Sequence, residues 1–172
     1  MAFLGPYLAA AVLLVVAGAA KVRDPGDLAT AAPVGPGTVR ALAAGELVLG
    51  VLAVVRPSTV TAALVALSYV AFAAYVLWLR TTGGPLATCG CFGAVDTAPT
   101  RTHVAVDVAL AVSAAAVAVG DVGGWLPDVL AGQPGGGWPL VGTAAAIALL
   151  AYGVLSPLAR VEGARRLYGA GA

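Results

Sequence analysis

Charged side chains are scarce in this sequence. Only 10% of the 172 residues are Asp, Glu, Lys or Arg, whereas 60% are hydrophobic and the mean hydropathy is +0.97. Because a soluble domain carries about 25% charged residues, most of this surface is not suited to water. The net charge is +1 and there is no long run of basic residues, which argues against binding to nucleic acid.

Metal-binding and thiol side chains are also few. The chain has two Cys, one His and one Met. Soft metal ions prefer thiolate and thioether ligands, so the lack of a second cysteine pair or of a His- and Met-rich path argues against metal transport. Both cysteines fall in one short stretch, Thr88-Cys89-Gly90-Cys91-Phe92-Gly93. Any thiol chemistry is therefore concentrated there.

Long apolar runs fill most of the chain. A helix needs about 20 residues to cross a bilayer core of about 30 Å, and five runs approach that length: Phe3–Ala20, Ala41–Val55, Val60–Leu79, Val104–Val119 and Trp138–Leu155. None alternates with a period of two residues, and helices satisfy their own backbone groups in lipid. We therefore predict an all-α integral membrane fold, in which a four-helix transmembrane bundle is followed by a fifth C-terminal transmembrane helix.

A chain of this length is expected to form one membrane domain over residues 1–172. The four-helix core would cover about 3–120, followed by a glycine-rich loop at 120–137, the fifth helix at 138–156 and a basic tail at 157–172. The first span lacks the basic segment that precedes the apolar part of a signal peptide. We expect it to be retained in a multi-pass protein of the plasma membrane.

The Cys89-Gly90-Cys91 stretch allows three interpretations. Cysteines two apart can reach the separation that a disulfide needs, and the small strained ring would make that disulfide labile and exchangeable. A cross-link over one residue restricts the unfolded chain very little, so a purely stabilising disulfide is a weak explanation. The pair could also bind a soft metal ion such as Cu(I) or Zn, or be two unremarkable thiols.

Four other polar residues are expected near the same end of the bundle. Lys21 closes the first span, Glu46 and Asp107 interrupt the second and fourth spans near the ends facing the cysteines, and His103 precedes Asp107 by one helical turn. The carboxylates could transfer protons and Lys21 could favour a thiolate. Alternatively, Lys21 and Glu46 form an ion pair, Asp107 favours the helix dipole, and His103 is an interfacial residue or a third metal ligand beside Cys89 and Cys91.

Three of these motifs together resemble the MauE/DoxX family of redox-associated membrane proteins, and the MauE branch in particular. They are Gly18-Ala19-Ala20-Lys21-Val22-Arg23-Asp24-Pro25, Glu46 with Gly50, and Cys89-Gly90-Cys91-Phe92-Gly93. The resemblance implies a four-helix core and disulfide chemistry beside a thioredoxin-like partner. DsbB and the vitamin K epoxide reductases are similar in architecture and pass electrons from dithiols to quinone.

The resemblance therefore implies that Cys89 and Cys91, helped by Lys21, Glu46 and Asp107, exchange electrons between a thioredoxin-like or thiol substrate and a membrane quinone. Phe92 and His103 are the candidate contacts of the quinone ring. Those enzymes commonly use two cysteine pairs, whereas this chain has one. Electrons would then pass directly between partner and acceptor. A soft-metal protein and a docking scaffold are the alternatives, and the sequence indicates no oligomeric state.

Charge counting and the resemblance disagree about the side on which the cysteines lie. Five spans place most cations on the cysteine side: Lys21, Arg23, Arg40, Arg80, Arg101, Arg160, Arg165 and Arg166, against Arg56 on the other. The positive-inside rule then favours the cytoplasm for the cysteines. Oxidative folding occurs outside the cytoplasm, and the family resemblance favours that side.

Overall fold

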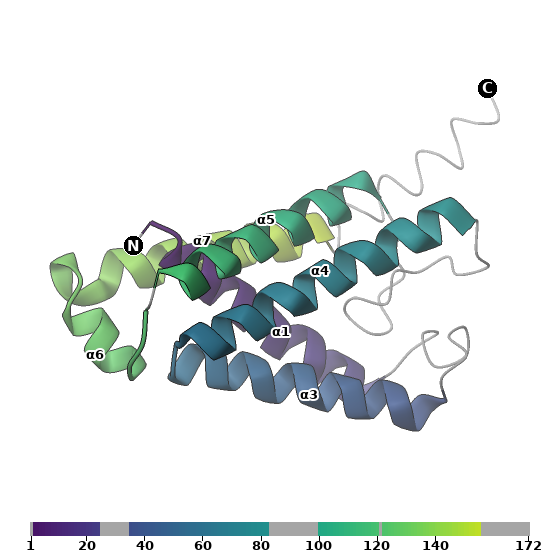
Figure 1. Ribbon diagram of the computed structural model, residues 1–172, viewed down its shortest axis with the longest axis horizontal. Coiled ribbons are helices and arrows are strands. Elements are labelled where there is room, and N and C mark those ends of the chain that lie inside the picture. Colours follow the sequence, from purple (N-terminus) through teal and green to yellow (C-terminus); the bar gives the residue numbers. More distant parts are fainter. Residues whose placement is uncertain (1, 25–34, 83–99, 121, 156–172) are drawn as a thin grey trace.

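The computed structural model describes residues 2–24, 35–82, 100–120 and 122–155, and every regular element in these ranges is helical (Figure 1). Five of its helices are long and apolar enough to cross a membrane. They are α1 (Leu4–Arg23), α3 (Pro36–Val55), α4 (Thr59–Thr82), α5 (Arg101–Val119) and α7 (Trp138–Gly153). The predicted all-α membrane fold is confirmed.

The five long helices alternate in direction along the bundle (Figure 1). One end holds the tight turn at 56–58, where the backbone N–H of Gly124 donates to the carbonyl of Pro57 at 3.2 Å. The opposite end, which we call the polar end, holds Lys21, Arg80 and His103 near the termini of α1, α4 and α5. Connection 83–99, whose sequence contains both cysteines, leaves α4 and enters α5 at the polar end.

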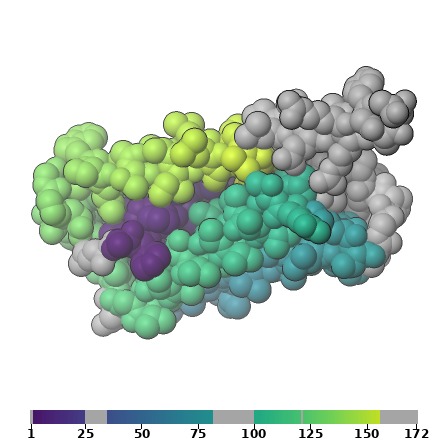
Figure 2. Space-filling model, turned by 90° about the horizontal axis from the view of Figure 1, so that it is seen from above, coloured from purple at the N-terminus to yellow at the C-terminus, as the bar shows by residue number. Residues whose placement is uncertain are grey.

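Helix α1 forms the centre of the bundle and packs against α3, α4, α5 and α7. Within the most apolar window of each helix, 61% of α1 is buried but only 11% of α7. Figure 2 shows α7 and α5 flanking the N-terminal part of α1. The outer helices therefore expose apolar side chains to lipid, while α1 contributes most of the core.

Two glycines let α1 and α3 approach closely. A Cβ added to Gly18 would lie 2.7 Å from the carbonyl oxygen of Ala43, and one added to Gly50 would lie 2.8 Å from that of Ala11. Small residues at helix crossings allow this backbone contact in membranes, where packing takes over from the hydrophobic effect. Gly18 and Gly50 thus set the spacing that brings Lys21 to Glu46.

Two tyrosines fasten α1 to its neighbours by hydrogen bonds to backbone carbonyls. The Tyr7 hydroxyl donates to Ala53 of α3 at 3.2 Å, and the Tyr69 hydroxyl of α4 donates to Ala10 at 2.8 Å. Both rings are buried, so each hydroxyl needs such a partner.

The structure corrects two expectations about helix boundaries. The second span begins at Pro36 and not at Ala41, because proline is favoured in the first turn of a helix. Glu46 therefore lies near the middle of α3, about 15 Å along it, and not near its end. The predicted glycine-rich loop also contains a short helix, α6 (Leu126–Ala131), before Gly135, Gly136 and Gly137 turn the chain with positive φ angles.

Candidate functional site

A buried ion pair lies inside the bundle near the polar end. Lys21 Nζ lies 2.6 Å from Glu46 Oε2, and the two side chains are only 7% and 16% exposed. Lys21 belongs to the last turn of α1, whereas Glu46 lies in the middle of α3. The long lysine side chain thus carries its charge inward from the helix end to a carboxylate at membrane depth. The predicted alternative, in which Lys21 and Glu46 form an ion pair, is confirmed.

The ring of Phe72 from α4 forms another wall of this site. Lys21 Nζ lies 5.0 Å from the ring centroid, within the range of a cation–π interaction. An apolar wall excludes water and so strengthens the attraction between Lys21 and the Glu46 carboxylate.

His103 joins the start of α5 to Leu155, which follows the end of α7. Its Nδ1 lies 2.8 Å from the hydroxyl of Thr100, and its Nε2 lies 3.2 Å from the carbonyl oxygen of Leu155. A carbonyl can only accept, so Nε2 carries a proton and donates to Leu155. The Thr100 oxygen also accepts from the His103 backbone N–H at 3.3 Å and caps α5. His103 is therefore a fully buried link between helices.

Asp107 follows His103 by one turn on the same face of α5 and is also buried, at 3% exposure. Residues four apart on a helix are neighbours, so this carboxyl group lies deeper along α5 than the imidazole. A buried carboxyl group in a membrane helix faces the bundle interior and is a candidate functional group. The structure thus places Asp107 inside the bundle, below the helix end that connection 83–99 enters.

The predicted residues Cys89, Cys91 and Phe92 lie outside the described residues. The ends of their connection, Thr82 and Thr100, belong to the polar end of the bundle. Among the residues that the structure describes, no three His, Cys, Asp or Glu side chains gather into a group that could hold a metal ion. The roles of the cysteines and of Phe92 stay predictions from the sequence.

Sequence reasoning missed the residues that surround these charged groups. Phe72 is one of many apolar residues in α4, and nothing in the sequence distinguishes it as the partner of Lys21. The Leu155 acceptor is a backbone carbonyl, which has no sequence signature. Thr100 could have been found, because threonine just before an apolar helix is a known N-cap signal.

A comparison with known protein families finds a match for the part of the chain that contains the first four long helices. Residues 1–120 match the family model described as Methylamine utilisation protein MauE. The chain belongs to the MauE family. The match covers α1, α3, α4 and α5, whereas α6 and α7 follow it. No curated protein and no solved structure matches the chain. The DoxX side of the predicted resemblance stays a prediction.

Proposed function

We propose that this MauE family member is a membrane thiol–disulfide oxidoreductase. In this proposal Cys89 and Cys91 exchange electrons between a thioredoxin-like partner and a membrane quinone. The resemblance to the MauE family, which the matching family model supports over residues 1–120, suggests disulfide chemistry beside a thioredoxin-like partner. The proposal places the reaction at the polar end, on the side of the membrane where oxidative folding takes place.

The observation that supports this proposal most is the buried Lys21–Glu46 pair. Charged groups inside a membrane bundle are costly, and they mark functional sites more often than structural ones. Lys21 lies in the last turn of α1 and reaches Glu46 of α3, while His103 and Asp107 lie in the first two turns of α5. Redox chemistry of a dithiol needs proton acceptors and donors within the protein, and these residues supply them.

The proposed reaction balances two electrons and two protons. A partner thiolate attacks the Cys89–Cys91 disulfide, and the mixed disulfide that forms is resolved by the second partner thiolate, which leaves the partner oxidised and the pair reduced. Oxidation of the pair forms one S–S bond and releases two protons, and the two electrons reduce a quinone to a quinol that takes up two protons. Lys21 favours the thiolate, while Glu46 and Asp107 relay the protons. Contact with the quinone ring is assigned to Phe92 from the sequence.

The soft-metal alternative would use Cys89, Cys91 and His103 as ligands. Both ring nitrogens of His103 already make hydrogen bonds, to Thr100 and to Leu155. Coordination would require the imidazole to give up one of these bonds and would leave a buried partner without its own. This geometry is a reason to prefer the redox function over the metal function.

The proposal is tested by electron transfer in liposomes that contain the full-length protein. A reduced thioredoxin serves as the dithiol donor and decylubiquinone as the acceptor, and quinone reduction is followed by absorbance. We expect the wild-type protein to accelerate the reaction and Cys89→Ser or Cys91→Ser to remove the acceleration. Arg56→Gln changes an exposed charge at the opposite end and should leave the rate unchanged. Equal rates for wild-type protein and both serine variants would refute the oxidoreductase function.

A further inference from the structure

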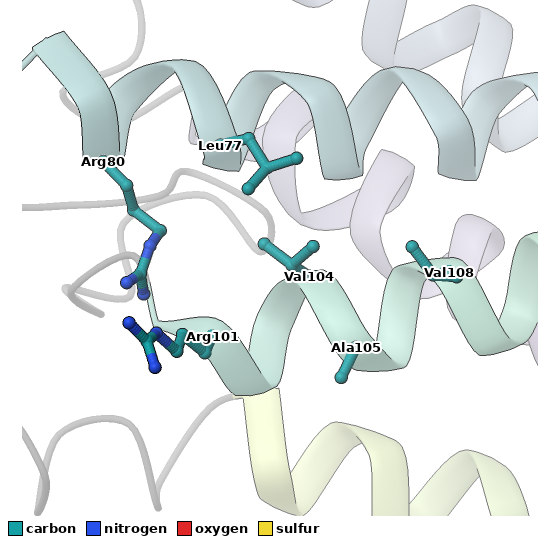
Figure 3. A pocket seen from close by; sticks show the side chains of 6 residues that line it. All are labelled: Leu77, Arg80, Arg101, Val104, Ala105 and Val108. Carbon is teal, nitrogen blue, oxygen red and sulfur yellow. The ribbon is translucent and has the colours of Figure 1, made fainter.

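A pocket of about 360 Å³ lies between α4 and α5 at the polar end (Figure 3). Four apolar residues and two arginines line it: Leu77, Arg80, Arg101, Val104, Ala105 and Val108. Leu77 and Val108 are 48% and 47% exposed, so the apolar wall opens sideways onto the outer surface of the bundle. In a membrane protein that surface meets lipid chains.

The two arginines concentrate positive charge at one end of the pocket. Figure 3 shows their side chains directed toward one another from α4 and from the start of α5. Among the described residues, the salt bridge that forms is the one between Lys21 and Glu46. Neither Arg80 nor Arg101 is paired with a carboxylate from these residues. Arg80 Nη1 is buried and makes no hydrogen bond. A buried donor without an acceptor and two adjacent like charges are both unfavourable, and an anion between the guanidinium groups would relieve both.

We propose that this pocket binds one anionic phospholipid. The phosphate lies between Arg80 and Arg101, because the planar guanidinium group matches phosphate in geometry and charge. The first part of one acyl chain follows Val104, Ala105 and Val108 along α5, and the rest of the lipid stays in the bilayer. A volume of about 360 Å³ suits such partial enclosure, since small-molecule sites span about 300–1,000 Å³.

The positive charge of this pocket favours an anionic lipid over a quinone as its ligand. A quinone ring is neutral and would leave both guanidinium groups without a counter-charge, whereas a phosphodiester neutralises one of them and hydrogen-bonds to both. The arginines lie near the ends of two membrane-spanning helices, which is the depth at which lipid headgroups lie. The lipid site is thus independent of the thiol function and can fail or succeed without it.

Native mass spectrometry of the full-length protein in neutral detergent tests the proposal. Phosphatidylglycerol and phosphatidylcholine of matched chain length are added at equal concentrations, and the first bound lipid is quantified. We expect phosphatidylglycerol to bind on the order of tenfold more tightly, since each basic residue adds to the attraction. Arg80→Gln/Arg101→Gln should remove this preference, whereas Arg56→Gln, which changes an exposed arginine at the other end, should keep it.

A second pair of variants tests the pocket without changing charge. Ala105 lines the pocket, and Ala105→Phe should fill it and weaken the first phosphatidylglycerol by a similar factor. Ala115 is exposed on the same helix outside the pocket, so Ala115→Phe should have no effect. Equal binding of the two lipids to the wild-type protein would overturn the proposal. The proposal would also be overturned if Arg56→Gln or Ala115→Phe weakened phosphatidylglycerol binding as much as the pocket variants do. Displacement of phosphatidylglycerol by decylubiquinone or by inorganic phosphate would overturn it as well.

Discussion

Lys21 Nζ of α1 lies 2.6 Å from Glu46 Oε2 of α3, within the apolar interior of the bundle. The two residues come from different helices, and the glycines at the crossing of α1 and α3 permit the approach. A buried pair of opposite charges stabilises a protein little compared with apolar residues of the same size, because desolvation offsets the attraction. Stability alone is therefore a weak reason for the presence of this pair, and the proposed function gives it a chemical role.

The first prediction separates the structural and chemical roles of this pair. Glu46→Gln leaves the buried Lys21 ammonium without a carboxylate and should lower the free energy of unfolding by about 3–5 kcal/mol. Lys21→Met/Glu46→Met removes both charges and should recover most of that stability. Both variants should lose quinone reduction. Thermal unfolding in detergent measures the stability of each variant, and the liposome assay measures its rate of quinone reduction. Full electron transfer by the stable double variant would show that the pair has no chemical role.

The second prediction concerns the close approach of α1 and α3. Gly18→Ala places a Cβ 2.7 Å from the Ala43 carbonyl oxygen, so the helices must separate and stability should fall by about 1–3 kcal/mol. Gly45 lies on the same helix as Ala43 with no atom within 4 Å of an added Cβ. Gly45→Ala should stabilise α3 by up to about 1 kcal/mol. Thermal unfolding of both variants measures these changes. Equal effects of Gly18→Ala and Gly45→Ala on stability would contradict the close contact between α1 and α3 at Gly18.

Two tyrosine hydroxyls provide the third prediction. Tyr69→Phe removes the bond to Ala10 and Tyr7→Phe removes the bond to Ala53. Each change should cost about 1 kcal/mol, and the double variant should be less stable than either single one. Chemical denaturation of the three variants measures these losses. A double variant no less stable than either single one would rule out independent anchoring of α1.

The fourth prediction distinguishes a structural from a ligating histidine. His103→Gln should release the end of α7, because the Nε2 bond to Leu155 is lost. Hydrogen–deuterium exchange of the last turn of α7 should rise, while the reduction potential of the cysteine pair stays unchanged. Thr100→Val should raise the same exchange more weakly by freeing the ring and uncapping α5. A loss of Zn or Cu(I) binding in His103→Gln, with unchanged exchange, would instead favour the metal alternative.

Much of the fold follows from apolar run length, which predicted all five spanning helices. Boundaries depend on local chemistry: Pro36 extends α3 beyond its apolar run and thereby moves Glu46 to mid-helix. The pairing of Lys21 with Glu46 could be predicted because both charges are rare within apolar spans. Phe72 and the Leu155 carbonyl could not, since a common apolar residue and a backbone group gain their roles only through tertiary packing.

The central claim, a reversible Cys89–Cys91 disulfide on the extracytoplasmic side, is tested most directly by labelling intact cells with a membrane-impermeant thiol reagent before and after mild reduction. We predict labelling of both cysteines only after reduction. Strong labelling that requires permeabilisation but no reductant would show free thiols in the cytoplasm and would contradict the account.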